Sequence, residues 1–331
     1  MSKVKTATAG LIKRITRMEI DKIYNMDCLE GMKQIPDGSI DAVICDLPYG
    51  TMKTVNPSEA WLKRRQCMWD DIIPTDQLFE QYERVLRMNG VAILFSQEPY
   101  TNHLRGYKYK NYNFGFGYPM MWRKNHFANP FIAKYAPVSY FEDISVFFKR
   151  YDTGGHHPVR EYSKAIMSYI GVTSCKQVNE RLGHRNAEHF FYVNSTQFAL
   201  CTAETYQELI DVFHIDKMDG FKTYNELVRL DVKYSRTFNI PDGKCTGNVL
   251  EYSKEGDTWH PTQKPVELIR HLVRLYTNEG DTVLDNCMGS GTTAIACIKE
   301  KRHFIGFELS KEYYDKACKR IKAEQAQLTL F

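Results

Sequence analysis

The position of one glycine-rich turn constrains the fold of this chain more than any other feature. Residues 285–294 (Asp-Asn-Cys-Met-Gly-Ser-Gly-Thr-Thr-Ala) join a predicted strand over 282–285 to a predicted helix over 291–301. A nucleotide-binding half of an open α/β sheet needs about three strands. After this turn the pattern predicts only one more strand, 303–307, and a final helix, 311–323. The missing strand must therefore come from elsewhere.

The N-terminal region can supply it. Apolar patterning predicts a short strand over 19–27, a short helix over 29–34 and an apolar strand over 42–45. If the first of these strands lies beside 303–307, the sheet is circularly permuted and the two terminal regions lie close together. We therefore expect an α/β fold with a permuted, mostly parallel sheet.

The middle of the chain predicts further elements and an insert. A helix over 75–87 is stopped by Asn89-Gly90 and is followed by a buried strand over 91–95 and a helix over 99–106. Two more strands, 118–122 and 144–148, flank an aromatic loop. We expect a basic tail (1–18), one half of the sheet (19–149), a largely helical insert (150–255), and the other half (256–331), which starts with a helix over 264–276.

Composition excludes several classes of protein. The 331 residues are 43% hydrophobic and carry a formal charge of +4, which is too small for a purely electrostatic binder of nucleic acid. Nine cysteines without a C-x-x-C pair indicate a reducing compartment rather than disulfides or zinc. No apolar run approaches the ~18 residues of a membrane span. We expect a cytoplasmic protein without a metal, and a homodimer remains open.

The glycine turn by itself allows three interpretations. Its glycines let backbone approach a ligand, the amides at the helix start favour a negative group, and Glu308 follows the next strand, where an acid can accept ribose hydroxyls. An adenosine-containing cofactor fits this pattern. Residues 289–294 also satisfy the dinucleotide fingerprint, so a nicotinamide cofactor, a methyl donor and a purely structural turn remain open.

A second motif, Asp46-Leu47-Pro48-Tyr49-Gly50, directly follows an apolar strand. It should therefore lie at the carboxyl edge of the sheet, where α/β proteins bind ligands. Asp46 and the carbonyl of Leu47 can accept the two hydrogens of a base amino group, and Tyr49 can stack on the base. A paired base offers neither interaction, so the base would be flipped out. The alternative is a strand-ending turn whose tyrosine fills the core.

With both motifs placed, the chain resembles the β-class amino DNA methyltransferases, which methylate adenine N6 or cytosine N4. In that family a D-P-P-Y segment comes first, a target-recognition insert follows and the cofactor loop comes last. The resemblance implies a circularly permuted Rossmann-like methyltransferase sheet with one antiparallel strand, and S-adenosylmethionine as cofactor. It covers nearly all of the chain outside the insert. Leu47 replaces the first proline of the catalytic motif, and Cys287 replaces the usual aromatic of the cofactor loop.

The resemblance assigns site residues position by position. Asp46, Leu47, Pro48 and Tyr49 take the catalytic role. The cofactor set comes from the segment around Asp27, from His260-Pro261-Thr262-Gln263-Lys264-Pro265 and from the glycine turn. It comprises Asp27, Cys28, His260, Thr262, Lys264, Pro265, Asp285, Asn286, Cys287, Gly289, Ser290, Gly291, Thr292, Thr293 and Glu308.

The implied activity is methylation of adenine N6 in duplex DNA. An aspartate at the head of the catalytic motif resembles the adenine enzymes more than the cytosine-N4 enzymes, which commonly begin with serine. Cytosine N4 and an amino group of RNA or protein are the alternatives. A dehydrogenase would leave the 46–50 and 260–265 motifs unexplained, and an inactive DNA-binding module would not need both Asp46 and Tyr49.

Candidate DNA contacts are less specific. The basic residues Lys63, Arg64 and Arg65 follow the catalytic motif, and Arg123-Lys124 ends a predicted strand; phosphate contact and a solvated basic surface are open for both. In the insert, two predicted helices around a 171–174 turn resemble a helix-turn-helix over 161–182. Its second helix would present Lys176, Gln177 and Arg181 to a major groove.

Overall fold

The structure is a computed structural model that describes residues 18–50, 71–107, 114–128, 133–149, 157–195, 197–240, 245–256, 258–260 and 262–328. Apart from Met18, the predicted basic tail lies outside these ranges, as does the Lys63-Arg64-Arg65 cluster. None of the helices in the described ranges is both long and apolar enough to cross a bilayer.

Eight strands in the described residues form one sheet in the order β1-β8-β7-β2-β3-β5-β4-β6. Their bounds are β1 Lys22–Tyr24, β2 Ile40–Asp46, β3 Leu86–Ser96, β4 Phe114–Ala128, β5 Ser139–Lys149, β6 Val249–Glu251, β7 Thr282–Asp285 and β8 His303–Phe307. All neighbours pair in parallel except β5, which is antiparallel to both β3 and β4. The predicted mostly parallel sheet with one antiparallel strand is confirmed.

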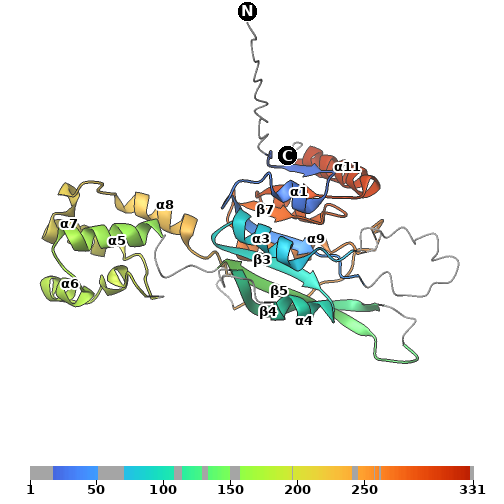
Figure 1. The fold of residues 1–331 in the computed structure, drawn as a ribbon, viewed down its shortest axis with the longest axis horizontal. Helices are drawn as coiled ribbons and strands as arrows, with labels where there is room; N and C mark the ends of the chain where they lie inside the picture. Colours follow the sequence, from blue (N-terminus) through green and yellow to red (C-terminus); the bar gives the residue numbers. More distant parts are fainter. Residues whose placement is uncertain are drawn as a thin grey trace, which may run out of the picture.

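The predicted permutation is confirmed as well. β1 pairs in parallel with β8, with Lys22 beside Ile305 and Tyr24 beside Phe307. The last helix, α11 (Lys311–Leu328), lies next to β1, so both ends of the described chain meet at the same side of the sheet (Figure 1). The N-terminal strand completes the sheet half that carries the glycine turn.

Helices cover both faces of this sheet because alternate residues of each strand point to opposite sides. In β2, Ala42 and Ile44 join one core, whereas Val43 and Cys45 join the other. The first core is closed by α9, α10 and α11, and the second by α1, α3 and α4. Their bounds are α1 Cys28–Met32, α3 Thr75–Val85, α4 Tyr100–Gly106, α9 Val266–Tyr276 and α10 Thr292–Lys299.

Two boundaries differ from the sequence prediction. α3 ends at Val85 and β3 begins at Leu86, so the helix is shorter and the strand longer than expected. Leu86 is fully buried and pairs with Ile40, which draws it into the sheet. Asn89 takes a left-handed conformation (φ 58°) within the strand, and the pairing of β2 and β3 shifts between Ile40 and Ala42.

The predicted aromatic loop between 122 and 144 is shorter than expected. β4 continues to Ala128 and β5 already starts at Ser139. The last residue of β3, Ser96, pairs with Asp143. The two strands therefore continue past the end of β3 as a two-stranded ribbon, visible at the lower right of Figure 1.

The insert is a separate helical body with its own core, which includes the fully buried Phe190 and Leu209 (Figure 1). Its elements are α5 Pro158–Tyr169, α6 Cys175–Leu182, η3 Glu188–Phe191, α7 Ala203–Phe213, η4 Ile215–Lys217 and α8 Tyr224–Tyr234. The predicted end of the insert at Glu255 is too late. β6 already belongs to the sheet, because Leu250 pairs with Trp122 of β4.

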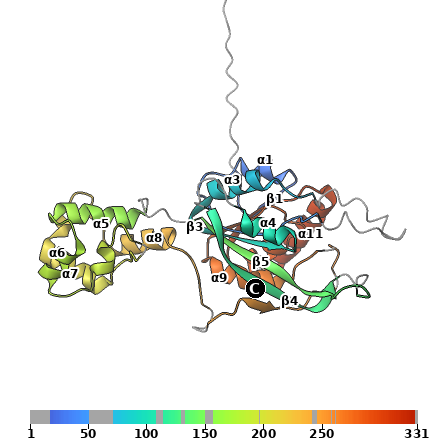
Figure 2. The ribbon, with the colours of Figure 1, turned by 60° about the horizontal axis from the view of Figure 1, so that its bottom comes forward.

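The insert is attached to the amino-terminal edge of the parallel strands. Arg87 at the start of β3 bonds to Asp41 and to the Ser235 carbonyl, and the Asn89 amide donates to the Tyr234 carbonyl. Asp46 lies at the other end of β2. Figures 1 and 2 both place the insert on the side of the sheet away from the β4–β5 ribbon.

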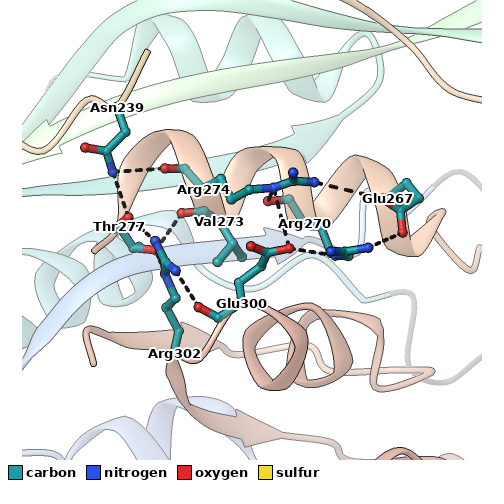
Figure 3. Close-up of polar contacts among 8 residues, drawn as sticks. All are labelled: Asn239, Glu267, Arg270, Val273, Arg274, Thr277, Glu300 and Arg302. Carbon is teal, nitrogen blue, oxygen red and sulfur yellow. Dashed lines mark hydrogen bonds and ion pairs between the residues drawn. The ribbon is translucent and has the colours of Figure 1, made fainter. Parts of the chain in front are cut away.

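The segment after the insert is held at this same edge. The Asn239 side chain donates to the carbonyls of Arg274 (3.0 Å) and Thr277 (2.9 Å) at the end of α9 (Figure 3). Arg302 donates to the Thr277 carbonyl at 2.7 Å, and Arg270 pairs with Glu300 at 2.7 Å. The Asn239 contacts fix where the chain returns from the insert, and the two arginine contacts join α9 and Thr277 to the residues before β8.

The packing of α1 on β8 generates a test. A Cβ added to Gly31 would come within 2.2 Å of the ring of Phe307, which is fully buried. We expect Gly31→Ala to lower the free energy of unfolding by about 1–3 kcal/mol, measured by urea denaturation. Gly106→Ala is the matched control, because nothing lies within 4 Å of its added Cβ. Equal stabilities of the two variants would contradict this account of the packing.

Candidate active site

A cavity of about 580 Å³ lies across the carboxyl ends of β8, β7, β2 and β3. Both predicted motifs line it: the glycine turn with Glu308 on one side, and Asp46 to Tyr49 on the other. The His260 segment contributes His260, Thr262 and Lys264, and the start of α1 contributes Asp27 and Cys28. The tertiary fold therefore brings together, at one edge, motifs that lie more than 200 residues apart.

The glycine turn is held by two polar side chains that bond within the protein. Asp285 accepts hydrogen bonds from the Cys287 amide (3.0 Å) and the Thr293 hydroxyl (2.6 Å), and burial raises its pKa to about 6. The side-chain oxygen Oδ1 of Asn286 accepts a hydrogen bond from the Tyr82 hydroxyl at 2.6 Å. Both side chains line the cavity, but their bonds first stabilise the turn itself.

Glu308 is the buried acid that faces this turn. One of its oxygens accepts from the Gly289 amide at 2.9 Å and the other from the Ser310 amide at 2.7 Å. Burial raises the pKa of this carboxyl. Each carboxylate oxygen has a second lone pair, so Glu308 can still accept hydroxyl donors from a ligand in the cavity.

Asp27 caps α1 by accepting a hydrogen bond from the Glu30 amide at 3.1 Å.

Gly289 and His260 form a close contact above the turn. Gly289 takes a left-handed conformation (φ 52°), and an added Cβ would lie 3.2 Å from the His260 Nε2. The His260 ring packs edge-on against Tyr313, with 4.5 Å between ring centres. Burial lowers the pKa of His260 to about 4, and the nearby Lys264 adds to this effect. The imidazole is therefore neutral near pH 7.

Asp46 lies in a buried cluster of four charged side chains. Lys264 pairs with Asp46 at 2.5 Å and with Glu142 at 3.2 Å, and Lys124 pairs with the other oxygen of Glu142. Lys264, Glu142 and Lys124 are each more than 90% buried. Two acids and two lysines balance in charge, which is the condition under which buried ions are tolerated. We call these four residues the charge cluster.

The charge cluster shifts the pKa values of Asp46 and Lys264. Burial and the Glu142 carboxylate raise the pKa of Asp46, whereas Lys264 opposes this rise. Burial acts against the charge of Lys264, but Asp46 and Glu142 together raise its pKa. The remaining oxygen of Asp46 accepts from the Tyr49 hydroxyl at 2.8 Å. Asp46 therefore has a bonded partner on each oxygen.

Three thiols lie beneath the cavity. Cys28, Cys45 and Cys287 all line it, and the Asn286 amide lies 3.4 Å from the Cys287 sulfur. Burial raises the pKa of Cys45 to about 12, so its thiol is protonated and unreactive. The cysteine at the position of the family's aromatic is thus part of a small apolar floor. Among the described residues no group of side chains has the arrangement of a metal site.

Several predicted site residues lie elsewhere. Pro265 is the N-cap of α9, and Gly291 is the left-handed N-cap of α10; neither lines the cavity. Pro261 lies outside the described residues. For Lys124 the sequence left phosphate contact and a solvated basic surface open, and the folded position fits neither, because Lys124 is 4% exposed and bonded to Glu142. Its strand alternates, so Arg123 is exposed and pairs with Glu251 at 2.9 Å.

The predicted recognition helix of the insert is present as α6, but two of its predicted DNA-contacting side chains bond within the insert. Gln177 closes a capping box with Ser174, and Arg181 donates to the Ile170 carbonyl at 3.1 Å. Lys176 is exposed. The turn between α5 and α6 therefore uses Gln177 and Arg181 for its own geometry.

Sequence reasoning did not identify Glu142 or the apolar walls around it. Trp122, Phe95 and Gln97 line the same cavity, and the Lys264 ammonium lies 5.2 Å from the centre of the Phe95 ring. The available signal was an acid, Glu142, placed at the head of an apolar strand. One of its two partners, Lys124, lies on the neighbouring strand, but Lys264, which joins it to Asp46, lies more than 100 residues away in the sequence, so the pattern alone could not assign it.

The sequence matches a known protein family and a characterised relative. The profile of the DNA methylase family N6_N4_Mtase matches residues 40–319. The Type II methyltransferase M.BglII of Bacillus subtilis is 25% identical over 326 residues, covering 93% of this chain and 71% of the relative.

Two solved structures share the fold. The crystal structure of the M1.HpyAVI-SAM complex has a TM-score of 0.51 at 20% identity and covers 90% of this chain and 98% of that one. The cytosine-N4-specific PvuII DNA methyltransferase also has a TM-score of 0.51, at 14% identity, and covers 92% of this chain and 87% of that one.

The buried neutral His260 generates a prediction about pH. An unfolded histidine takes up a proton near pH 6.5, whereas folded His260 does so only near pH 4. Lowering the pH through this window therefore favours the unfolded state, by up to about 3 kcal/mol. We expect the stability difference between the wild type and His260→Gln, measured by urea denaturation, to move in favour of the variant by this order between pH 7 and pH 4. A constant difference would contradict it.

Proposed function

Because the chain belongs to the DNA methylase family of N6 and N4 methyltransferases, we propose that it transfers a methyl group to N6 of an adenine flipped out of duplex DNA. The observation that carries this proposal is the position of Asp46. Asp46 lines the same cavity as Glu308 and the glycine turn, and it is bonded to Tyr49 and Lys264.

The cofactor is S-adenosylmethionine, and the residues of the cavity fit it. Glu308 keeps lone pairs for ribose hydroxyls, and Gly289 leaves open a space that a Cβ would fill against His260. When bound, the cofactor supplies an activated methyl group for direct transfer to a nucleophile. The neutral His260 adds no positive charge to the cavity that would hold this cationic cofactor.

In this mechanism Asp46 orients the target amino group. The lone pair of such a group is delocalised into the base, so an acceptor must hold its hydrogens and draw the nitrogen towards tetrahedral geometry. Lys264 occupies one oxygen of Asp46 and the Tyr49 hydroxyl the other. The amino group would take the place of the Tyr49 hydroxyl, which leaves the tyrosine ring to stack on the base.

Leu47 and the charge cluster complete the proposed mechanism. The Leu47 carbonyl, followed by Pro48, accepts the second amino hydrogen, and its backbone role does not require the proline of the family motif. After methyl transfer the nitrogen loses a proton, and Asp46 is the nearest acceptor. Burial raises the pKa of this carboxyl, which makes it a better acceptor of that proton than an exposed aspartate.

The choice of adenine rests on the aspartate at the head of the catalytic motif. Incubation with duplex DNA and methyl-labelled cofactor, followed by nucleoside analysis, tests it. We expect label in N6-methyldeoxyadenosine. Label in N4-methyldeoxycytidine would replace adenine by cytosine, and label only in nucleosides of added RNA would overturn the choice of DNA.

Asp46 and Lys264 should have separable effects. We expect Asp46→Asn to lower kcat at least about a hundredfold, because the amide has one acceptor oxygen where Lys264 and the base need one each, while the Kd for S-adenosylmethionine stays within a few-fold. Lys264→Met removes the cation that favours ionised Asp46, so the acid limb of its kcat–pH profile should move to higher pH. Isothermal titration and initial rates measure both effects. An unshifted acid limb would remove Lys264 from this role.

A further inference from the structure

The β4–β5 ribbon projects from the edge of the sheet that carries the active site. Beyond Ser96, β3 offers no further partner to β5, and β6 pairs only with Met121, Trp122 and Arg123 of β4. We call residues 123–128 and 133–141 the catalytic-edge ribbon. It continues the cavity wall directly, because Trp122, Lys124 and Glu142 at its base line the cavity.

The surface of this ribbon combines exposed aromatic rings with positive charge. Phe127, Tyr135, Tyr140 and Phe141 are 41–89% exposed, and Phe127 packs edge-on against Tyr140 at 5.8 Å. Of its three basic residues, Lys124 is buried against Glu142 and Arg123 pairs with Glu251, and the ribbon itself contains no aspartate or glutamate. Lys134 is exposed. Exposed aromatic rings on a ribbon without acidic residues are suited to bind a nucleic acid, because bases can stack on the rings and no carboxylate repels the phosphates.

The helical insert is far from this edge. Its anchors, Arg87 and Asn89, lie at the start of β3, and Ser96 at the other end is seven residues from Asn89. At about 3.3 Å per residue the anchors are about 23 Å from the catalytic edge, and Figures 1 and 2 show the insert extending further away. In one subunit the ribbon is much closer than the insert to DNA that surrounds a flipped base.

We propose that the catalytic-edge ribbon enters the major groove of the DNA beside the target base, and that it, rather than the helical insert, contacts the flanking base pairs bound by the same subunit. The major groove admits a two-stranded ribbon, whereas the minor groove is about half as wide. The exposed rings contact base edges or unstacked bases, and Lys134 contacts phosphate. This inference rests on the proposed action on duplex DNA.

Paired variants of the full-length protein test the assignment. Lys134→Ala in the ribbon is matched with Lys176→Ala in α6, since both lysines are exposed. Binding to short mixed-sequence duplexes, and to duplexes that carry a mapped methylation site, is measured by fluorescence anisotropy at several salt concentrations. We expect Lys134→Ala to reduce the slope of log K against log salt by about 0.9, and Lys176→Ala to leave it unchanged.

The aromatic contribution is tested with Phe127→Ala/Tyr140→Ala. We expect about tenfold weaker binding of the site-containing duplex, with unchanged affinity for S-adenosylmethionine as evidence of an intact fold. Tyr169→Ala on the insert is the matched control for an exposed ring.

The outcomes separate this inference from the proposed function. Weaker binding only in the insert variants would overturn the inference, as would ribbon variants that change the oligomeric state without affecting DNA. Methylation of DNA by ribbon variants at the wild-type rate and affinity would overturn it while leaving the enzyme assignment intact. Ribbon-dependent binding without methyl transfer to any DNA would support the ribbon and overturn the proposed reaction.

Discussion

The buried ion pair between Lys264 and Asp46 links the two halves of the chain, and the geometry of the site depends on it. Lys264 comes from the segment before α9, Asp46 from the end of β2, and Glu142 joins them from β5. A buried charge costs several kcal/mol unless it is paired with good geometry. The three segments are therefore held in one relative arrangement, and that arrangement brings the proposed catalytic acid to the cofactor cavity.

The polarity of the sheet separates the tasks of the molecule. Parallel strands collect their carboxyl ends at one edge, and there the turns after β2, β7 and β8 form the cavity. The one antiparallel strand, β5, ends at the opposite edge, so the insert that follows it starts there. β4 runs in the same direction as β3, so it ends at the catalytic edge and the turn that joins it to β5 lies there. One strand direction thus decides which segment is near the chemistry.

Bonding within the cavity distinguishes structural groups from ligand-facing groups. Asp285 and Asn286 are bonded to the turn and to Tyr82, and they hold its shape. Glu308 keeps a free lone pair on its bonded oxygens, and Asp46 can exchange the Tyr49 hydroxyl for a ligand donor. All of them lie in motifs that a sequence comparison would treat alike. The difference between them comes from which oxygen has a partner in the folded protein.

The sequence alone determined the strand order around the glycine turn, the permutation and the two motifs, because strand periodicity and turn residues are local signals. It also predicted a largely helical insert with two helices around the 171–174 turn. Only the tertiary structure decided that Lys124 is buried against Glu142, that the aromatic loop is a projecting ribbon and that the insert lies at the far edge. Each of these depends on pairing between residues distant in the chain, and local periodicity carries no information about which partner a strand end or a buried charge will meet.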